Sequence, residues 1–128
     1  MTQNIPVPYD AEFQSPIPSI WRDCIIQIVE AFKDKDFERL NTLPSVQYID
    51  LAYAAEIAKN IDDYGAHLMS LAEESWHTSV CLYMENESWQ AMIDLFTIEE
   101  GRSDLIIDLF IFKKEDQFIF QINNIYVP

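Results

Sequence analysis

The spacing of apolar residues along the chain changes once, near residue 78. Between residues 19 and 64 apolar residues recur every three or four positions, which is the period of an amphipathic helix. After residue 78 apolar and polar residues alternate, and β-branched and aromatic residues dominate every run. This order predicts an α+β fold in which helices precede a sheet.

The first part of the chain predicts two main helices. Ser19 is expected to cap the first, and a short helical turn at 36–40 follows it. Ser45 is expected to cap the second, which ends where Gly65 suits the left-handed position after a helix. Residues 66–76 predict a connector with at most one helical turn.

Residues 1–18 are predicted to form a leader that lies extended across the domain or frays, because four of the six prolines of the chain lie within it. The remaining residues, 19–128, are expected to form a single α+β domain, since a chain of 128 residues has room for one core.

The alternating segments predict four strands, at 78–84, 89–97, 103–112 and 118–127. Short polar connections favour antiparallel neighbours, so the expected architecture is two main N-terminal helices packed on a four-stranded antiparallel meander. The order of helices and strands is also similar to that of the cone-shaped nuclear-transport-factor-like fold.

A three-residue loop that ends in Gly101 predicts a register in which Thr97 faces Ser103 and Asp94 faces Ile106. In the next hairpin, even positions of the third predicted strand share a face with odd positions of the fourth.

This register gives the sheet one apolar face, which we expect the helices to cover. It consists of Trp89, Ala91, Ile93, Leu95, Leu105, Ile107, Leu109, Ile111, Phe118, Phe120 and Ile122. The other face is mixed and consists of Gln90, Met92, Asp94, Phe96, Asp104, Ile106, Asp108, Phe110, Phe112, Ile119, Gln121, Asn123 and Ile125. If the connection between the first two predicted strands also has an even number of residues, Cys81 lies on the mixed face and Cys24 on the helix side. No disulfide is then expected between them.

The composition disfavours several classes of function. With 22 acidic and 8 basic residues the formal net charge is −14, which disfavours binding to a phosphate backbone, so nucleic acid is not an expected partner. Two glycines are too few for a phosphate-binding loop. No stretch approaches 18 apolar residues and no secretory signal is recognised, so we expect a cytoplasmic protein without a membrane segment.

The sequence offers little for catalysis. His67 and His77 lack a metal-binding spacing, and no serine lies in a nucleophile motif. We therefore expect no enzyme activity and assign no catalytic, cofactor-binding or metal-binding residue.

Asp94 and Asp108 are expected to lie diagonally on the mixed face beside Asn123. Three interpretations are open at this point: a solvated polar stripe, a protein-binding patch, or a metal-binding or catalytic pair. For a metal site, only Asp104 and Asn123 are available as further ligands.

The distribution of acids favours a binding surface. Residues 41–111 carry 13 acids against Lys59 and Arg102, and the loop and strand acids are expected to cluster around Phe96, Ile106 and Phe110. An acidic rim around apolar anchors suits a basic protein partner. The predicted partner-binding residues are Asp94, Phe96, Glu99, Glu100, Asp104, Asp108, Phe110 and Asn123.

Four segments of the chain also resemble a known group. They are Asp62-Asp63-Tyr64-Gly65, Leu68-Met69-Ser70-Leu71, Glu99-Glu100-Gly101-Arg102-Ser103-Asp104-Leu105 and Ile122-Asn123-Asn124-Ile125-Tyr126-Val127. They resemble short acidic bacterial immunity proteins of toxin–immunity systems, including contact-dependent growth inhibition loci. The resemblance implies an inhibitor that covers the active cleft of a cognate basic toxin, for which a nuclease is the expected class.

A small-molecule-binding protein or enzyme is the alternative. In that case the mixed face would be concave and would line a pocket, with Asp94 and Asp108 as its polar groups and Phe96, Phe110 and Phe112 as its walls.

Overall fold

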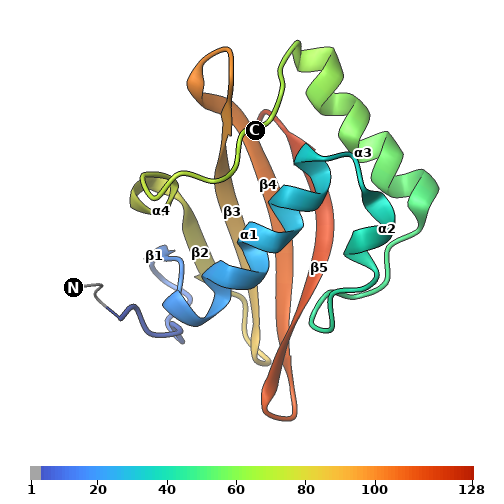
Figure 1. Ribbon diagram of the computed structural model, residues 1–128. Helices are drawn as coiled ribbons and strands as arrows, with labels where there is room; N and C mark the ends of the chain where they lie inside the picture. The colour runs from blue at the N-terminus through green and yellow to red at the C-terminus, as the bar shows by residue number, and fades with distance from the viewer. Residues whose placement is uncertain (1–3) are drawn as a thin grey trace.

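The computed structural model describes residues 4–128, which form one five-stranded antiparallel sheet with helices on one side (Figure 1). The elements in chain order are β1 (Ser15–Pro16), α1 (Ser19–Lys33), α2 (Phe37–Leu40), α3 (Leu51–Tyr64), α4 (Ser75–Thr78), β2 (Val80–Tyr83), β3 (Ser88–Thr97), β4 (Gly101–Lys114) and β5 (Gln117–Tyr126). The strands are ordered β1-β2-β3-β4-β5 across the sheet. The predicted α+β class and antiparallel sheet are confirmed, but the described residues contain five strands rather than four.

The fifth strand comes from the leader. Ser15 and Pro16 pair with β2, which places β1 at the edge of the sheet, where the missing N–H of a proline is tolerated. The rest of the described leader lies against the domain and turns at residues 11–13. The indole of Trp89 donates to the Pro8 carbonyl at 2.7 Å, and Ser19 N donates to the Ile5 carbonyl at 3.0 Å. Residues 1–3 of the predicted leader lie outside the described residues.

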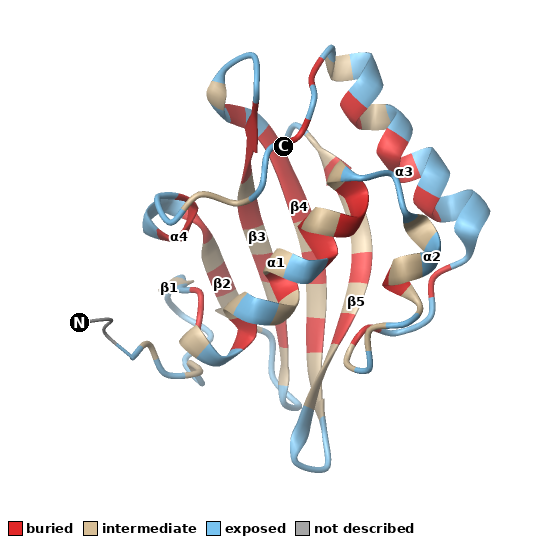
Figure 2. Ribbon diagram, in the orientation of Figure 1, coloured by how far each residue is buried: buried red, intermediate tan, exposed pale blue. Residues whose placement is uncertain are grey.

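Helix α1 crosses the sheet and covers its apolar face (Figure 2). Trp21, Ile25 and Ile28 are fully buried beneath it, and the Trp21 ring meets the Trp89 ring edge-on at 5.5 Å. Every residue predicted for the apolar face is buried except Phe118, which is half-buried. The prediction that the helices cover this face is confirmed.

Helix α3 begins at Leu51, so the predicted start at Ser45 is wrong. Residues 45–47 instead pair in parallel with β5, where Phe120 N donates to the Ser45 carbonyl at 2.8 Å. The cap is Asp50, whose carboxylate accepts from the amide of Ala52 at 2.8 Å. The helix ends as predicted at Gly65, which adopts the left-handed conformation with φ of +85°.

The same helix covers the outer edge of β5. The Tyr53 hydroxyl donates to the Asn123 carbonyl, and the Asn60 amide donates to the Ile125 carbonyl at 2.8 Å. These bonds occupy backbone acceptors that would otherwise lie open at a sheet edge. Both exposed edges of the predicted meander are therefore covered, one by β1 and the other by α3 and the segment before it.

The register of the β3–β4 hairpin agrees with the prediction at one point and differs at another. Asp94 lies opposite Ile106 as expected, but Thr97 lies opposite Gly101 rather than Ser103. The difference arises because residues 103–105 stand opposite a single residue of β3, and the Ser103 hydroxyl donates to its carbonyl at 2.8 Å. Gly101, the first residue of β4, adopts the left-handed conformation with φ of +74°.

The assignment of Cys81 to the mixed face is wrong. Tyr83 lies opposite Trp89, so residues 84–88 form a connection with an odd number of residues, whereas an even number was assumed. Cys81 therefore lies opposite Ala91 on the helix side and is fully buried. Cys24 packs against the same core, so the two cysteines do not lie on opposite sides of the sheet as predicted. Both are free thiols.

A second irregularity shifts the end of β5. Leu109 lies opposite Ile122 and Asp108 opposite Asn124, so Asn123 is an extra residue in β5. Ile125 consequently faces the helices and is fully buried, contrary to its assignment to the mixed face. Such a bulge reverses the alternation of faces after it.

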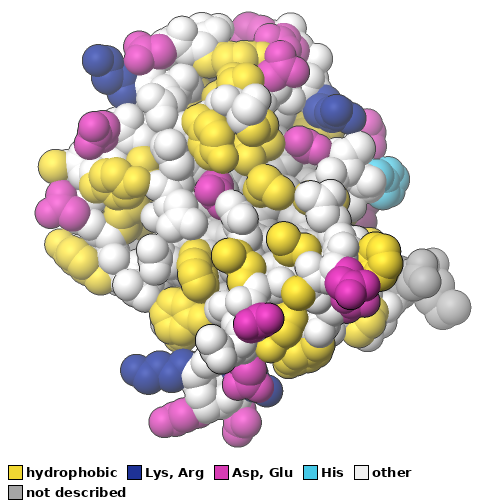
Figure 3. All heavy atoms as spheres, turned by 180° about the vertical axis from the view of Figure 1, so that it is seen from behind, with side chains coloured by type: hydrophobic (Ala, Val, Ile, Leu, Met, Phe, Trp, Pro, Cys, Tyr) yellow, Lys and Arg dark blue, Asp and Glu magenta, His cyan; other side chains and the backbone are white. Residues whose placement is uncertain are grey.

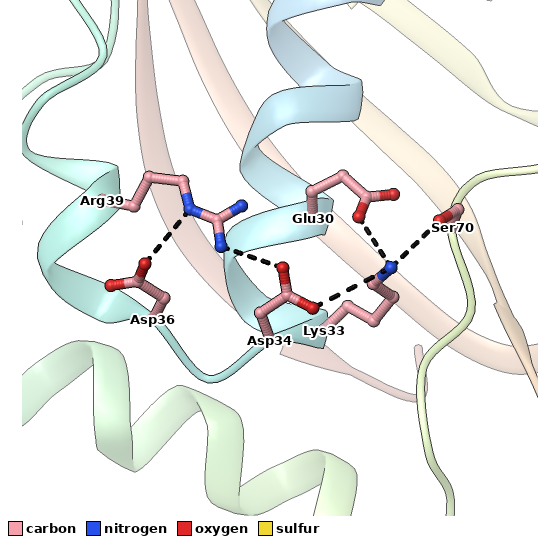
Figure 4. Close-up of polar contacts among 6 residues, drawn as sticks. All are labelled: Glu30, Lys33, Asp34, Asp36, Arg39 and Ser70. Atoms are coloured by element: carbon pink, nitrogen blue, oxygen red, sulfur yellow. Dashed lines mark hydrogen bonds and ion pairs between the residues drawn. The ribbon is translucent and has the colours of Figure 1, made fainter.

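The junction of α1 and α2 holds a chain of ion pairs (Figure 4). The Lys33 ammonium lies 2.8 Å from the Glu30 carboxylate and 3.9 Å from that of Asp34. The Arg39 guanidinium lies 2.9 Å from the Asp34 carboxylate and 3.3 Å from that of Asp36. Three acids of this junction, Glu30, Asp34 and Asp36, therefore lie against bases of the same chain.

Candidate protein-binding face

The side of the sheet turned away from α1, called here the outer face, lies open behind the strands. The described helices cover the opposite side or the sheet edges (Figure 1). Cross-strand pairing places on the outer face Pro16, Val80, Leu82, Ser88, Gln90, Met92, Asp94, Phe96, Arg102, Ile106, Asp108, Phe110, Phe112, Lys114, Gln117, Ile119, Gln121, Asn124 and Tyr126. Figure 3 shows apolar side chains gathered over this face with acidic side chains between and around them.

The outer face presents partly exposed apolar side chains. Met92, Phe110, Phe112 and Ile119 are half-buried, and the rings of Phe110 and Phe112 lie 6.2 Å apart. Of the apolar anchors predicted from the sequence, Phe110 is therefore accessible. The other two are not: Phe96 is 9% exposed and Ile106 is 6% exposed.

The Phe96 prediction fails because long-range packing closes the end of the sheet where this residue lies. The connector after α3 runs along β3, and Met69 N donates to the Phe96 carbonyl at 2.8 Å. Spacing along a strand does not reveal that a distant segment lies beside it.

Asp94 is held from three sides by α4 and the residues around it. The Thr78 hydroxyl donates to its carboxylate, the Ser75 hydroxyl donates to its carbonyl at 2.6 Å, and its amide donates to the Ser79 hydroxyl at 2.9 Å. All three partners are neutral, so the position of the carboxylate is fixed while its charge is not compensated.

Asp108 is held in a similar way. Its carboxylate accepts from the side-chain amide of Gln90 at 3.1 Å, across the β3–β4 pair. Asp94 lies opposite Ile106 and Asp108 opposite Met92, which confirms the predicted diagonal arrangement of the two carboxylates. Within residues 4–128, neither carboxylate has a basic group within 4.0 Å.

The acids of the β3–β4 loop are tied to the end of α3. The Tyr64 hydroxyl donates to Glu100 at 2.8 Å and accepts from the amide of Asp104 at 3.2 Å. The Glu99 carboxylate lies 2.7 Å from His67 Nδ1 and accepts from the His67 amide at 2.8 Å. These bonds from His67 lower the pKa of Glu99. The predicted cluster is thus divided, with Asp94 and Asp108 on the outer face and Glu99 and Glu100 at the hairpin end.

Asn123, also predicted for the site, lies at the bulge in β5. Its side chain accepts from Gln121 at 3.2 Å, and its carbonyl accepts from Tyr53. The residue opposite Asp108 is Asn124, which the period-2 pattern had not placed on this face. Only recognition of the bulge could have identified Asn124 and Tyr126 as members.

The described residues provide little for nucleophilic or metal chemistry. Burial raises the pKa of Cys24 to about 11, with a further contribution from Asp23, and burial raises that of Cys81 to about 12. Both are therefore protonated at neutral pH and poor nucleophiles. Among residues 4–128 no group of three or more His, Cys, Asp and Glu side chains is arranged to hold a metal ion.

A cavity of about 530 Å³ lies at a different place from the pocket that the small-molecule interpretation required. It is bordered by α4, β1 and the start of α1, and its lining includes Arg22, Trp76 and His77 but neither Asp94 nor Asp108.

In the part of the chain that is described, no helix has the length and apolar character needed to span a membrane.

The chain matches a protein family over most of its length. A family described as a domain of unknown function (DUF7668) matches residues 29–128, from the middle of α1 to the end of the chain. No curated protein and no solved structure matches the chain significantly, so the likeness to the nuclear-transport-factor-like cone stays a prediction.

Proposed function

The chain belongs to the DUF7668 family, and for this member we propose the function of a non-catalytic cytoplasmic inhibitor that binds a basic toxin through its outer face. The observation that carries the proposal is the juxtaposition of two fixed, uncompensated carboxylates with accessible apolar side chains. Asp94 and Asp108 supply the charges, and Met92, Phe110 and Phe112 supply the apolar area.

The dimensions of the face suit a protein partner. Three strands spaced by about 4.8 Å and paired over about nine residues, together with β2, which is paired over four, cover roughly 500 Å². A standard interface uses about 800 Å² on each partner, so the outer face and a modest rim are sufficient. The exposed side chain of Asp104 belongs to that rim.

The charge suits a basic partner. At a net charge of −14, long-range attraction accelerates encounter with a cationic surface, and burial of the apolar side chains slows dissociation. A toxin that acts on a polyanion such as nucleic acid needs a basic cleft. The resemblance to immunity proteins supports a nuclease as the class of toxin, and inhibition then requires only that the outer face covers the cleft.

The test is growth rescue. Each protein encoded beside this gene is expressed in bacteria with and without this chain, and the toxic ones are identified by loss of growth. We expect co-expression of the chain to restore growth, and we expect Asp94→Asn combined with Asp108→Asn to abolish the rescue. Asp62→Asn combined with Asp63→Asn removes the same charge from α3 and is expected to leave the rescue intact. The absence of any toxic neighbour, or rescue by both double variants, would reject the proposal.

A further inference from the structure

The cavity of about 530 Å³ between α1, α4 and β1 carries an inference that is independent of the outer face. Its volume lies in the range of about 300–1,000 Å³ that is typical of ligand-binding clefts. The residues that matter for its chemistry are Arg22, Glu73, Trp76 and His77.

Arg22 is fixed in this cavity before any ligand arrives. Its Nε and Nη2 atoms donate to the Ile17 carbonyl at 3.1 and 3.0 Å. Its guanidinium carbon lies 5.1 Å from the centre of the Trp76 ring, and Trp76 itself is 5% exposed. A guanidinium has five N–H groups, so three are left for a further acceptor.

The charge of Arg22 is not neutralised by the protein. Although the chain contains 22 acidic residues, none of those described places a carboxylate oxygen within 4.0 Å of this guanidinium. An oriented guanidinium with free N–H groups beside a cavity is suited to bind a carboxylate.

Glu73 supplies the opposite charge in the same cavity. Its side chain is exposed, and the described residues place no basic group within 4.0 Å of it, Arg22 included. The cavity therefore presents a cation and an anion that are separated rather than paired. A ligand that carries both an ammonium and a carboxylate group can satisfy both.

The net charge of the protein also selects such a ligand. A free anion must approach a molecule of charge −14, whereas a zwitterion has no net charge and meets no long-range repulsion. We infer that the cavity lined by Arg22, Trp76 and Glu73 binds a small zwitterion, a free amino acid or a dipeptide, with its carboxylate on Arg22 and its ammonium on Glu73.

The test uses glycylglycine as the probe and follows the Arg22 Nε–H and Trp76 indole N–H signals of the ¹⁵N-labelled protein by NMR. The Trp76 signal is identified with Trp76→Phe. Glycylglycine amide lacks the carboxylate and N-acetylglycylglycine lacks the ammonium. We expect saturable shifts with glycylglycine and roughly tenfold weaker binding of each analogue, because each loses one charged hydrogen bond.

Two variants separate ligand binding from folding. Glu73→Gln changes an exposed side chain and is expected to make glycylglycine bind as weakly as its N-acetyl analogue. Glu74→Gln removes the same charge one residue away, outside the lining, and is expected to bind like the wild type. Shifts that do not saturate, equal affinity for all three probes, or wild-type affinity in Glu73→Gln would overturn the inference. Binding of inorganic phosphate as tightly as glycylglycine would overturn it as well, because the cavity would then be a simple anion site.

Discussion

The helix side and the outer face of the sheet are formed by the same strands but differ in how far their apolar side chains are covered. On the helix side of β4, Leu109 and Ile111 are fully buried beneath the helices. Their neighbours Phe110 and Phe112 point the other way and stay half-buried, with no described helix over them. The chain itself covers the apolar side chains of one face, whereas those of the other face stay partly exposed to solvent.

The acidic side chains of the two regions also differ in their partners. At the α1–α2 junction Asp34 lies against both Lys33 and Arg39, and Glu30 lies against Lys33. On the outer face Asp94 and Asp108 accept hydrogen bonds from neutral donors. Three bases, Lys33, Lys35 and Arg39, thus pair with acids among the helices, whereas the two sheet carboxylates have no basic group within 4.0 Å among the described residues.

The comparison of the two faces is tested most strongly by truncating adjacent residues of β4. Leu109→Ala opens a cavity in the core and is expected to lower the free energy of unfolding by about 2–5 kcal/mol. Phe110→Ala removes a half-exposed ring and one aromatic contact, so about 1 kcal/mol is expected. Urea denaturation measures both. Similar losses for the two variants would mean that the outer face is part of the core of the isolated protein.

The second test compares sheet acids with helix acids. Asp94→Asn with Asp108→Asn is expected to weaken toxin binding by about 2–5 kcal/mol, or at least roughly 30-fold in Kd, because fixed charges are desolvated in the complex. Asp62→Asn with Asp63→Asn removes solvated charges and is expected to change Kd less than about fivefold. Calorimetric titration gives both values, and thermal midpoints check that the folds are intact. Equal changes would place the interface on the helices or loops.

The face of a residue could be predicted wherever the alternation of a strand was unbroken. The apolar face beneath α1 followed from this alternation. The diagonal placement of Asp94 and Asp108 was also correct, because the irregularity at residues 103–105 adds two residues to β4 and so restores the predicted register. Prediction failed for Cys81 and Ile125, because an odd connection and a bulge each shift the alternation by one residue. Neither feature has a glycine or proline to mark it in the sequence.

Contacts between segments that are distant in the chain could not be predicted from the sequence. The hydrogen bonds between His67 and Glu99 and between Tyr64 and Glu100 form because α3 ends beside the β3–β4 hairpin. Pairing of residues 45–47 with β5 likewise replaced the helical start that Ser45 suggested. The anchoring of Arg22 over Trp76 was missed for the same reason, since more than 50 residues separate them in the chain.

Ionic strength provides a third and smaller test. Raising the salt concentration from about 0.05 to 0.5 M is expected to slow association of the wild type with the proposed toxin roughly tenfold, because long-range attraction is screened. The Asp94→Asn, Asp108→Asn variant is expected to show a shallower dependence, since it lacks two of the steering charges. Stopped-flow association rates measure this slope. Identical slopes would show that the remaining acids, rather than the outer face, guide the encounter.

The smallest expected effect concerns the paired acids of the helix side. The hydrogen bond from Lys33 lowers the pKa of Glu30 below its ordinary value of 4.5, with a further contribution from Ser70. A carboxyl whose pKa is lower in the folded state stabilises the fold above its unfolded pKa, and this contribution is lost as the pH falls through the folded value. Glu30→Gln is therefore expected to be slightly less stable than the wild type at pH 7 and equally stable near pH 3. Lys33→Met removes the other partner and should give the same convergence. Thermal midpoints across this pH range measure it, and a difference from the wild type that persists at pH 3 would assign the loss to packing rather than to the ion pair.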